Sequence, residues 1–132
     1  MSIAVARDIV ERARAEGRGA LSEADGKTLL AAFSIPVPRM LVAADAADAA
    51  KKAATLSPPL AVKLISPDVL HKSDVGGVAL DIPDAGGAAA AVEAMSARPA
   101  LAAVRIEGWL VEEMAPAGCE VCLLYTSPSP RD

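Results

Sequence analysis

The chain has 132 residues, the size of one ordinary domain or of a piece of a larger protein. Its 13 basic and 17 acidic side chains give a formal net charge of −4, which argues against a nucleic-acid-binding surface. No apolar run approaches the roughly 18 residues of a membrane-spanning helix. Charges interrupt the apolar N-terminus, unlike a secretory signal. We expect a cytoplasmic protein without nucleic-acid or membrane partners.

Alanine accounts for 30 of the 132 residues, whereas only three residues are aromatic. The core must therefore consist of Val, Leu, Ile and many small side chains, and its helices should pack closely. The two cysteines, Cys119 and Cys122, do not make a disulfide framework, which suits a reducing compartment.

Two helices are predicted at the start of the chain. Apolar residues of 3–16 fall on one helical stripe, and the glycines that follow end this helix. Ser22 is a helix-capping residue that opens the second helix, and Glu23 and Asp25 favour the positive end of its dipole. This helix must stop before Pro36.

The remainder of the chain alternates between strand and helix patterns. Strands are expected over 36–43, 60–65, 78–82 and 108–114, and helices over 45–56 and 84–98. This order is the split β-α-β-β-α-β pattern, which predicts an α+β (α/β-like) fold with an antiparallel sheet and helices on one face. We expect a helical lead over 1–36 and the sheet domain over 37–121.

The last eleven residues, CLLYTSPSPRD (122–132), differ abruptly from the Ala/Val/Leu-rich chain before them. A disordered Pro/Ser tail is one interpretation. Back-translation gives a second, because the resulting codons resemble an adapter used in sequencing libraries. We interpret 122–132 as adapter-derived and expect the natural reading frame to continue beyond residue 121. This interpretation also removes a C-x-x-C redox or zinc motif.

Lys63 lies in the middle of the apolar run 60–65. An unpaired ammonium group is costly to bury, so this side chain must reach a cleft, a carboxylate or an anionic ligand. The alternative is an edge-strand lysine whose stem covers apolar surface and whose amine remains in water.

His71 is the only histidine, and it stands in a loop with Lys72, Asp74, Gly76 and Gly77. A histidine nitrogen can accept and donate a phosphoryl group, and its charge changes near neutral pH. Lys72 could neutralise the phosphate and Asp74 could orient the ring. The two glycines could bring backbone N–H groups to oxyanions. The alternative is a solvated histidine beside an ordinary turn.

Carboxylates gather near the end of the last predicted strand. Glu112 and Glu113 end it, Met114 and a Pro-Ala-Gly turn follow, and Glu120 comes next. Main-chain groups of such a link could bind an adenine, and Glu120 could reach ribose hydroxyls. Solvated carboxylates at a strand end are the alternative.

Together, these motifs resemble those of a known family. SPDVLHKSDVGGV (66–78), with FSIPVPR (33–39), AVKL (61–64) and GWLVEEMAPAGCEV (108–121), resembles the ATP-grasp part of ADP-forming acyl-CoA synthetases. This is the acetate–CoA ligase (ADP-forming) family, which is related to the succinyl-CoA synthetase β chain. The resemblance covers roughly residues 5–121 and implies the first lobe of an ATP-grasp fold.

The resemblance implies formation of an acyl phosphate, transfer to CoA, and phosphoryl exchange with ADP or ATP. It assigns the phosphate relay to His71 and binding of nucleotide phosphates to Lys63. It assigns adenine and ribose contacts to the strand end and hinge: Glu112, Glu113, Met114 and Glu120. ATP or ADP with Mg²⁺ would be bound by the complete protein.

Partner domains are implied as well. CoA and a small carboxylic acid would bind to a separate ligase subunit or a fused domain. The Mg²⁺ carboxylates and a Gly-rich loop belong to a second lobe, and nothing after Val121 resembles them. We therefore expect the chain alone to be inactive as a ligase and to bind nucleotide weakly at most.

Three alternatives stay open. The same lobe could be a non-catalytic nucleotide-binding or regulatory module. It could also be the ATP-grasp-like region of a protein lysine acetyltransferase. The third alternative is a small α+β domain of unrelated role.

Overall fold

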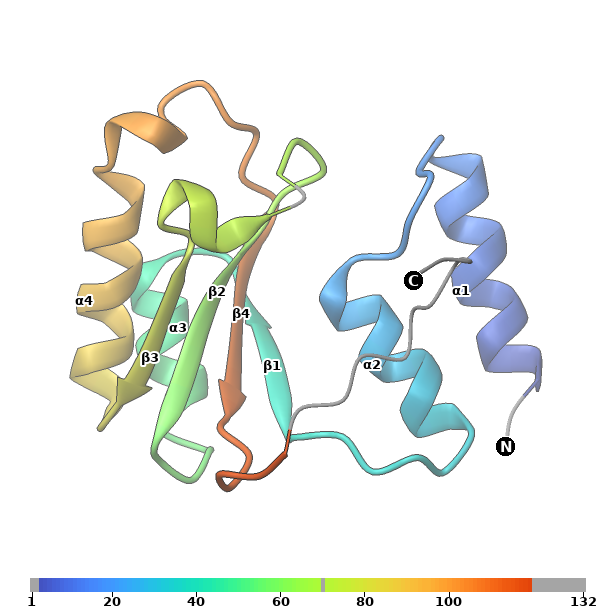
Figure 1. The fold of residues 1–132 in the computed structure, drawn as a ribbon, viewed down its shortest axis with the longest axis horizontal. Helices are drawn as coiled ribbons and strands as arrows, with labels where there is room; N and C mark the ends of the chain where they lie inside the picture. The colour runs from blue at the N-terminus through green and yellow to red at the C-terminus, as the bar shows by residue number, and fades with distance from the viewer. Residues whose placement is uncertain (1–2, 70, 120–132) are drawn as a thin grey trace, which may run out of the picture.

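The computed structural model describes residues 3–69 and 71–119 and contains a four-stranded sheet with helices on both sides (Figure 1). The helices are α1 (Ile3–Ala15), α2 (Glu23–Ala32), α3 (Ala46–Ala53) and α4 (Ala85–Ser96). The strands are β1 (Met40–Ala43), β2 (Leu60–Ile65), β3 (Val78–Ile82) and β4 (Gly108–Glu113). Short 3₁₀ turns cover Lys72–Val75 and Pro99–Leu101. No described helix is long and apolar enough to cross a membrane.

The strand order is β1-β4-β2-β3, and all neighbouring strands are antiparallel. β2 and β4 therefore occupy the centre of the sheet. This arrangement confirms the predicted α+β class and the antiparallel sheet. β1 begins at Met40, later than predicted, because the prolines at 36 and 38 lack the N–H group that a strand ladder uses. The division into a lead (1–36) and a sheet domain (37–121) stays a prediction.

Three of the helices begin at a side-chain cap. Ser22, Asp45 and Asp84 precede α2, α3 and α4. Each side chain accepts a hydrogen bond from the backbone N–H of the third residue after it, at 2.8 to 3.1 Å. Such caps satisfy N–H groups that the first helical turn leaves without a partner, and they fix where each helix starts.

The hydrophobic core lies between one face of the sheet and the helices α3 and α4 (Figure 1). Because side chains alternate along a strand, every second residue of the central strands enters it. These core residues are Leu60, Val62 and Leu64 of β2, and Trp109 and Val111 of β4. The buried alanines Ala49, Ala53 and Ala88 allow α3 and α4 to approach each other closely.

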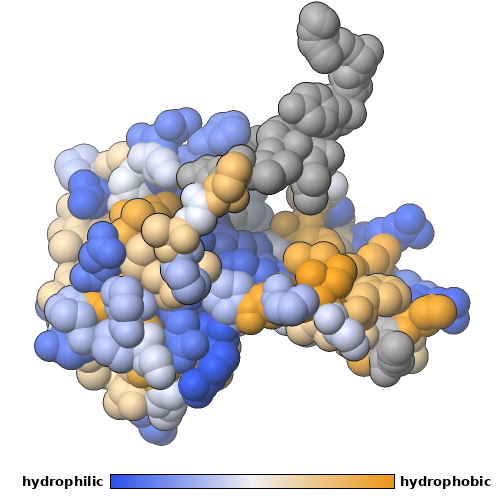
Figure 2. Space-filling model, turned by 60° about the horizontal axis from the view of Figure 1, so that its bottom comes forward, coloured by the Kyte–Doolittle hydropathy of each residue, from blue (hydrophilic) through white to orange (hydrophobic). Residues whose placement is uncertain are grey.

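Helices α1 and α2 form a pair on the other side of the sheet (Figure 1). Figure 2 shows this pair as a narrower arm beside the larger body, with hydrophobic side chains reaching its surface. The exposed large apolar residues of the first 36 are Ile3, Val5, Leu30, Phe33 and Ile35. α2 buries no residue fully, and ion pairs join it to the sheet.

The close approach of α3 and α4 can be tested at Ala49, which is 0% exposed. We expect Ala49→Leu to lower the free energy of unfolding by about 1–3 kcal/mol, because a packed core has no room for the larger side chain. Ala47→Leu, on the exposed side of the same helix, should change it by less than about 0.5 kcal/mol. Urea unfolding followed by fluorescence of the buried Trp109 measures both, and equal stabilities would contradict this packing.

Candidate functional site

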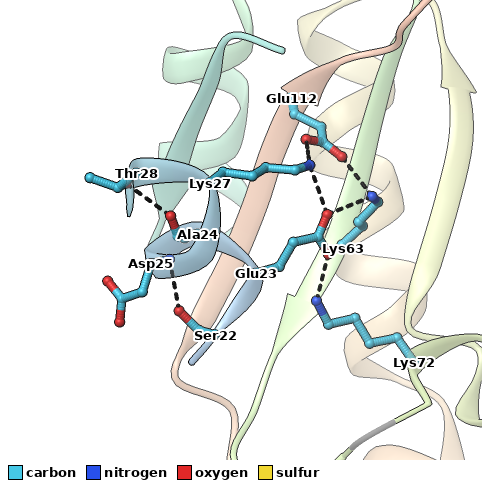
Figure 3. Close-up of polar contacts among 9 residues, drawn as sticks. All are labelled: Ser22, Glu23, Ala24, Asp25, Lys27, Thr28, Lys63, Lys72 and Glu112. Atoms are coloured by element: carbon cyan, nitrogen blue, oxygen red, sulfur yellow. Dashed lines mark hydrogen bonds and ion pairs between the residues drawn. The ribbon is translucent and has the colours of Figure 1, made fainter. Parts of the chain in front are cut away.

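A cluster of charged side chains occupies the sheet face opposite the core (Figure 3). We call it the lysine–glutamate cluster; its members are Glu23 and Lys27 of α2, Lys63 of β2, Lys72 of the 3₁₀ turn and Glu112 of β4. The Lys63 Nζ lies 2.8 Å from Glu23 Oε2 and 2.6 Å from Glu112 Oε1. The Lys72 Nζ lies 2.8 Å from Glu23 Oε1. Lys27 pairs with both glutamates.

The strand register brings Lys63 and Glu112 together. Ala61 stands opposite Glu112, and Lys63 stands opposite Leu110, so Lys63 and Glu112 are diagonal neighbours on one face. Lys63 points away from the core that Val62 enters. Because β2 lies between β4 and β3, Lys63 is no edge-strand lysine. The sequence predicted that its ammonium group reaches a cleft, a carboxylate or an anionic ligand, and the structure shows that it reaches two carboxylates.

Helix α2 supplies the second carboxylate. Ser22 caps the helix, so Glu23 lies in the first turn and Lys27 follows one turn later on the same side. Figure 3 shows both side chains directed toward the sheet. No motif in the sequence marks Glu23 and Lys27 as site residues. Their four-residue spacing, together with the need of Lys63 for an acidic partner, was the available signal.

Glu23 and Lys63 keep their charges at neutral pH. Burial alone would raise the pKa of Glu23, but hydrogen bonds from Lys27, Lys63 and Lys72 lower it to about 2. Burial alone would lower the pKa of Lys63, but hydrogen bonds to Glu112 and Glu23 raise it above its ordinary value. Three lysines and two glutamates leave a formal charge of +1.

Burial makes this pairing necessary. Glu112 is only 4% exposed, and a buried carboxylate requires cations and hydrogen-bond donors around it. Lys27 and Lys63 supply both.

His71 is the chain neighbour of Lys72, a member of the cluster. It is exposed and directly precedes the 3₁₀ turn that begins with Lys72, whose side chain returns to Glu23. The contact that the structure gives between His71 and Asp74 is made by the backbone, where the Asp74 N–H donates to the His71 carbonyl at 3.1 Å. The predicted orientation of the ring by the Asp74 carboxylate stays a prediction.

Gly76 and Gly77 shape the turn after His71. Gly76 has φ +70°, and a Cβ there would lie 3.0 Å from the Arg98 side chain. The Gly77 N–H donates to the Lys72 carbonyl at 2.7 Å, and the Gly76 N–H donates to the Ser73 carbonyl at 3.2 Å. Both N–H groups are thus engaged within the turn, as the alternative of an ordinary turn expects. Their predicted contact with oxyanions stays a prediction.

Glu113 and Met114 lie at the end of β4, beside an open pocket of about 350 Å³. The Glu113 carboxylate accepts a hydrogen bond from the Ser57 N–H at 2.8 Å and pairs with Arg39 at 3.2 Å. The Met114 N–H donates to the Pro59 carbonyl at 3.0 Å. The other lining residues are Pro36, Val37, Pro38, Ala115 and Pro116.

Five of the predicted site residues therefore fall into two groups, while Asp74, Gly76 and Gly77 shape the turn after His71. Lys63, Lys72 and Glu112 meet in the lysine–glutamate cluster, whereas Glu113 and Met114 line the pocket at the strand end. Glu120 and the segment 122–132 lie outside the described residues. Within the described ranges, no three His, Cys, Asp or Glu side chains gather where they could hold a metal ion.

Known proteins are similar to this chain in sequence and in architecture. The chain matches the family model of the ATP-grasp domain over residues 12–129. It is 36% identical over 121 residues to the β subunit of acetate–CoA ligase (ADP-forming) I from Pyrococcus furiosus, a match that covers 90% of this chain and 52% of that one.

Solved structures agree. ACD1 from Candidatus Korarchaeum cryptofilum, in complex with coenzyme A, superposes with a TM-score of 0.80 and 32% identity over 86% of this chain and 50% of that one. The dinucleotide-forming acetyl-coenzyme A synthetase 1 of the same organism gives a TM-score of 0.69 and 28% identity over 86% of this chain and 46% of that one. That structure holds coenzyme A and Mg-AMPPCP, and its phosphohistidine segment points towards the nucleotide-binding site.

The chain spans about half the length of these proteins. The comparisons confirm the family resemblance of the sequence motifs. The chain belongs to the ATP-grasp domain family, in the group that includes the β subunits of ADP-forming acetate–CoA ligases.

Proposed function

We propose that this chain is the nucleotide-binding lobe of an ADP-forming acyl-CoA ligase and that His71 relays a phosphoryl group to or from the nucleotide. The observation that supports this most directly is the shared carboxylate of Glu23. It holds the ammonium groups of Lys63 and Lys72 together, and Lys72 directly follows the exposed His71 in the chain. Two lysines at one place provide the charge that phosphate oxygens require.

The cluster retains hydrogen-bonding capacity for an anion. An ammonium group has three N–H donors. Among the described residues, Lys63 directs two of them to carboxylates and Lys72 directs one, which leaves one and two donors respectively. With a formal charge of +1, the cluster can accept phosphate oxygens without breaking its own ion pairs.

The proposed relay proceeds in two displacements. A neutral nitrogen of His71 attacks the phosphorus of an acyl phosphate, or of a phosphohistidine on a partner domain. The P–O or P–N bond to the donor breaks and a new N–P bond forms. A β-phosphate oxygen of ADP then attacks the same phosphorus, which releases the histidine and yields ATP. Lys63 and Lys72 hold the nucleotide phosphates and balance their charge.

The remaining predicted residues take supporting positions in this proposal. The pocket with Glu113 and Met114 holds the adenine, because its lining is mainly apolar and Glu113 directly follows Glu112 of the cluster in β4. Glu112 orients Lys63, to which its carboxylate is bound. The ribose contact of Glu120 remains a prediction from the resemblance.

We extend the proposal to the complete protein. It would bind ATP or ADP with Mg²⁺, and a separate subunit or fused domain would bind CoA and the small carboxylic acid. Two relatives support this extension. The Pyrococcus furiosus relative is a β subunit, and the Korarchaeum synthetase structure holds coenzyme A with a magnesium nucleotide analogue.

The relay predicts the effect of His71→Ala in the complete ligase. Acetyl-CoA formation should fall by at least about a hundredfold while ADP binding persists, because only the phosphoryl acceptor is lost. Ser73→Ala, in the exposed turn next to it, is the matched control and should keep wild-type turnover. A coupled assay and a nucleotide-binding titration measure the two properties. Undiminished turnover of His71→Ala would refute the relay.

A second expectation concerns the 132-residue chain by itself. We expect no acetate- and CoA-dependent formation of ADP from ATP, because the chain spans about half the length of its relatives and the resemblance assigns the Mg²⁺ ligands and the CoA site to a second lobe and a partner domain. A coupled assay for ADP on the purified chain measures this. Acetate-dependent turnover by the chain alone would contradict the expectation.

A further inference from the structure

We propose that Glu23 is a positioning residue of the phosphoryl-transfer site: its carboxylate holds Lys72, and with it the His71 segment, against Lys63. The inference rests on the proposed function and adds a residue from outside the motif that suggested it. Glu23 lies in α2, 48 positions before His71 along the chain, whereas the motif occupies the turn after β2.

The two oxygens of Glu23 divide their contacts in a particular way. Oε2 accepts hydrogen bonds from Lys27 and Lys63, each at 2.8 Å, and Oε1 accepts one from Lys72 at 2.8 Å. Within the described residues, Glu23 alone contacts all three lysines of the cluster. One carboxylate therefore links α2, the central strand β2 and the turn that carries the histidine (Figure 3).

The three lysines differ in whether they have a carboxylate partner other than Glu23. Lys27 and Lys63 each have a second carboxylate in Glu112, which would remain after Glu23 is changed. For Lys72 the structure gives one carboxylate contact, and it is to Glu23. Loss of the Glu23 charge should therefore release Lys72 selectively.

The turn needs this second attachment. At its C-terminal end it is joined to β2, where the Leu64 N–H donates to the Gly77 carbonyl at 2.8 Å. At its N-terminal end the Lys72 side chain reaches across to Glu23. A turn fixed at both ends presents His71 at a constant distance from Lys63, which in-line phosphoryl transfer requires.

A competing interpretation makes Glu23 a substitute for a phosphate, which the nucleotide must displace. The spare donors of Lys63 and Lys72 argue against it, since phosphate oxygens can bind without removing Glu23. The two interpretations predict opposite effects. If Glu23 competes with phosphate, removing its charge should tighten nucleotide binding. If Glu23 is a positioning residue, removing its charge should lower turnover.

The test uses Glu23→Gln in the complete ligase, which removes the charge and keeps the side-chain size. Turnover should fall about ten- to a hundredfold, the effect of losing one charge-assisted hydrogen bond. The KM for ADP should rise only a few-fold, because Lys63 keeps Glu112 and the released Lys72 retains its charge near the site. Labelling of His71 by γ-labelled ATP should slow in parallel. Glu23→Asp, which retains the charge, should recover part of the rate.

The matched control is Asp25→Asn, which removes a charge from the same helix turn. Asp25 pairs with Arg12 of α1 at 2.9 Å and takes no part in the cluster, so this variant should turn over normally. Thermal unfolding of each variant shows whether it is folded.

Three results would overturn the inference: wild-type turnover and labelling in Glu23→Gln, equal losses in Glu23→Gln and Asp25→Asn, or tighter ADP binding in Glu23→Gln. Failure of the proposed function looks different, because His71 would then carry no label even in the wild-type enzyme, and the inference would fall with it.

Discussion

Lys63 places an ammonium group in the middle of an apolar central strand, and much of this structure depends on how that charge is compensated. The group cannot remain unpaired there. Glu112 reaches it diagonally from the neighbouring strand, and Glu23 reaches it from α2. The compensation therefore also joins α2 to the sheet. An assembly of this kind contributes less to stability than its contacts suggest, because its charges must first be desolvated.

The two faces of the sheet have different roles: one forms the hydrophobic core and the other carries the charged candidate site. On one face, α3 and α4 pack on alternate residues of β2 and β4 and form the hydrophobic core. On the other face, the intervening residues of the same strands carry Lys63 and Glu112. Strand alternation thus lets a single strand serve both purposes. In the proposed function, the rigid core holds the phosphate-binding lysines in place while the exposed turn presents His71.

Local signals in the sequence determine most of the fold. β2 and β3 have the predicted bounds because breakers flank short apolar, β-branched runs, and three capping residues mark the helix starts. The start of β1 was predicted too early, since prolines in an extended segment resemble a strand but cannot pair in one.

The site was only partly predictable. The motif around His71 and the strand lysine point to it in the sequence, and the requirement that Lys63 have a partner follows from electrostatics alone. Which partner it takes is a tertiary property, because Glu23 lies 40 residues away and its first-turn position already has a local explanation in the helix dipole. For the same reason, the sequence could not distinguish whether Glu112 points to the hinge or to the sheet face.

The most direct measurement is a crystal structure of the complete ligase with a non-hydrolysable nucleotide. We predict phosphate oxygens within hydrogen-bond distance of the Lys63 and Lys72 ammonium groups, the adenine beside Met114, and His71 next to the terminal phosphate, with the Glu23 contacts retained. A nucleotide bound elsewhere, leaving the lysine–glutamate cluster without a phosphate contact, would contradict it.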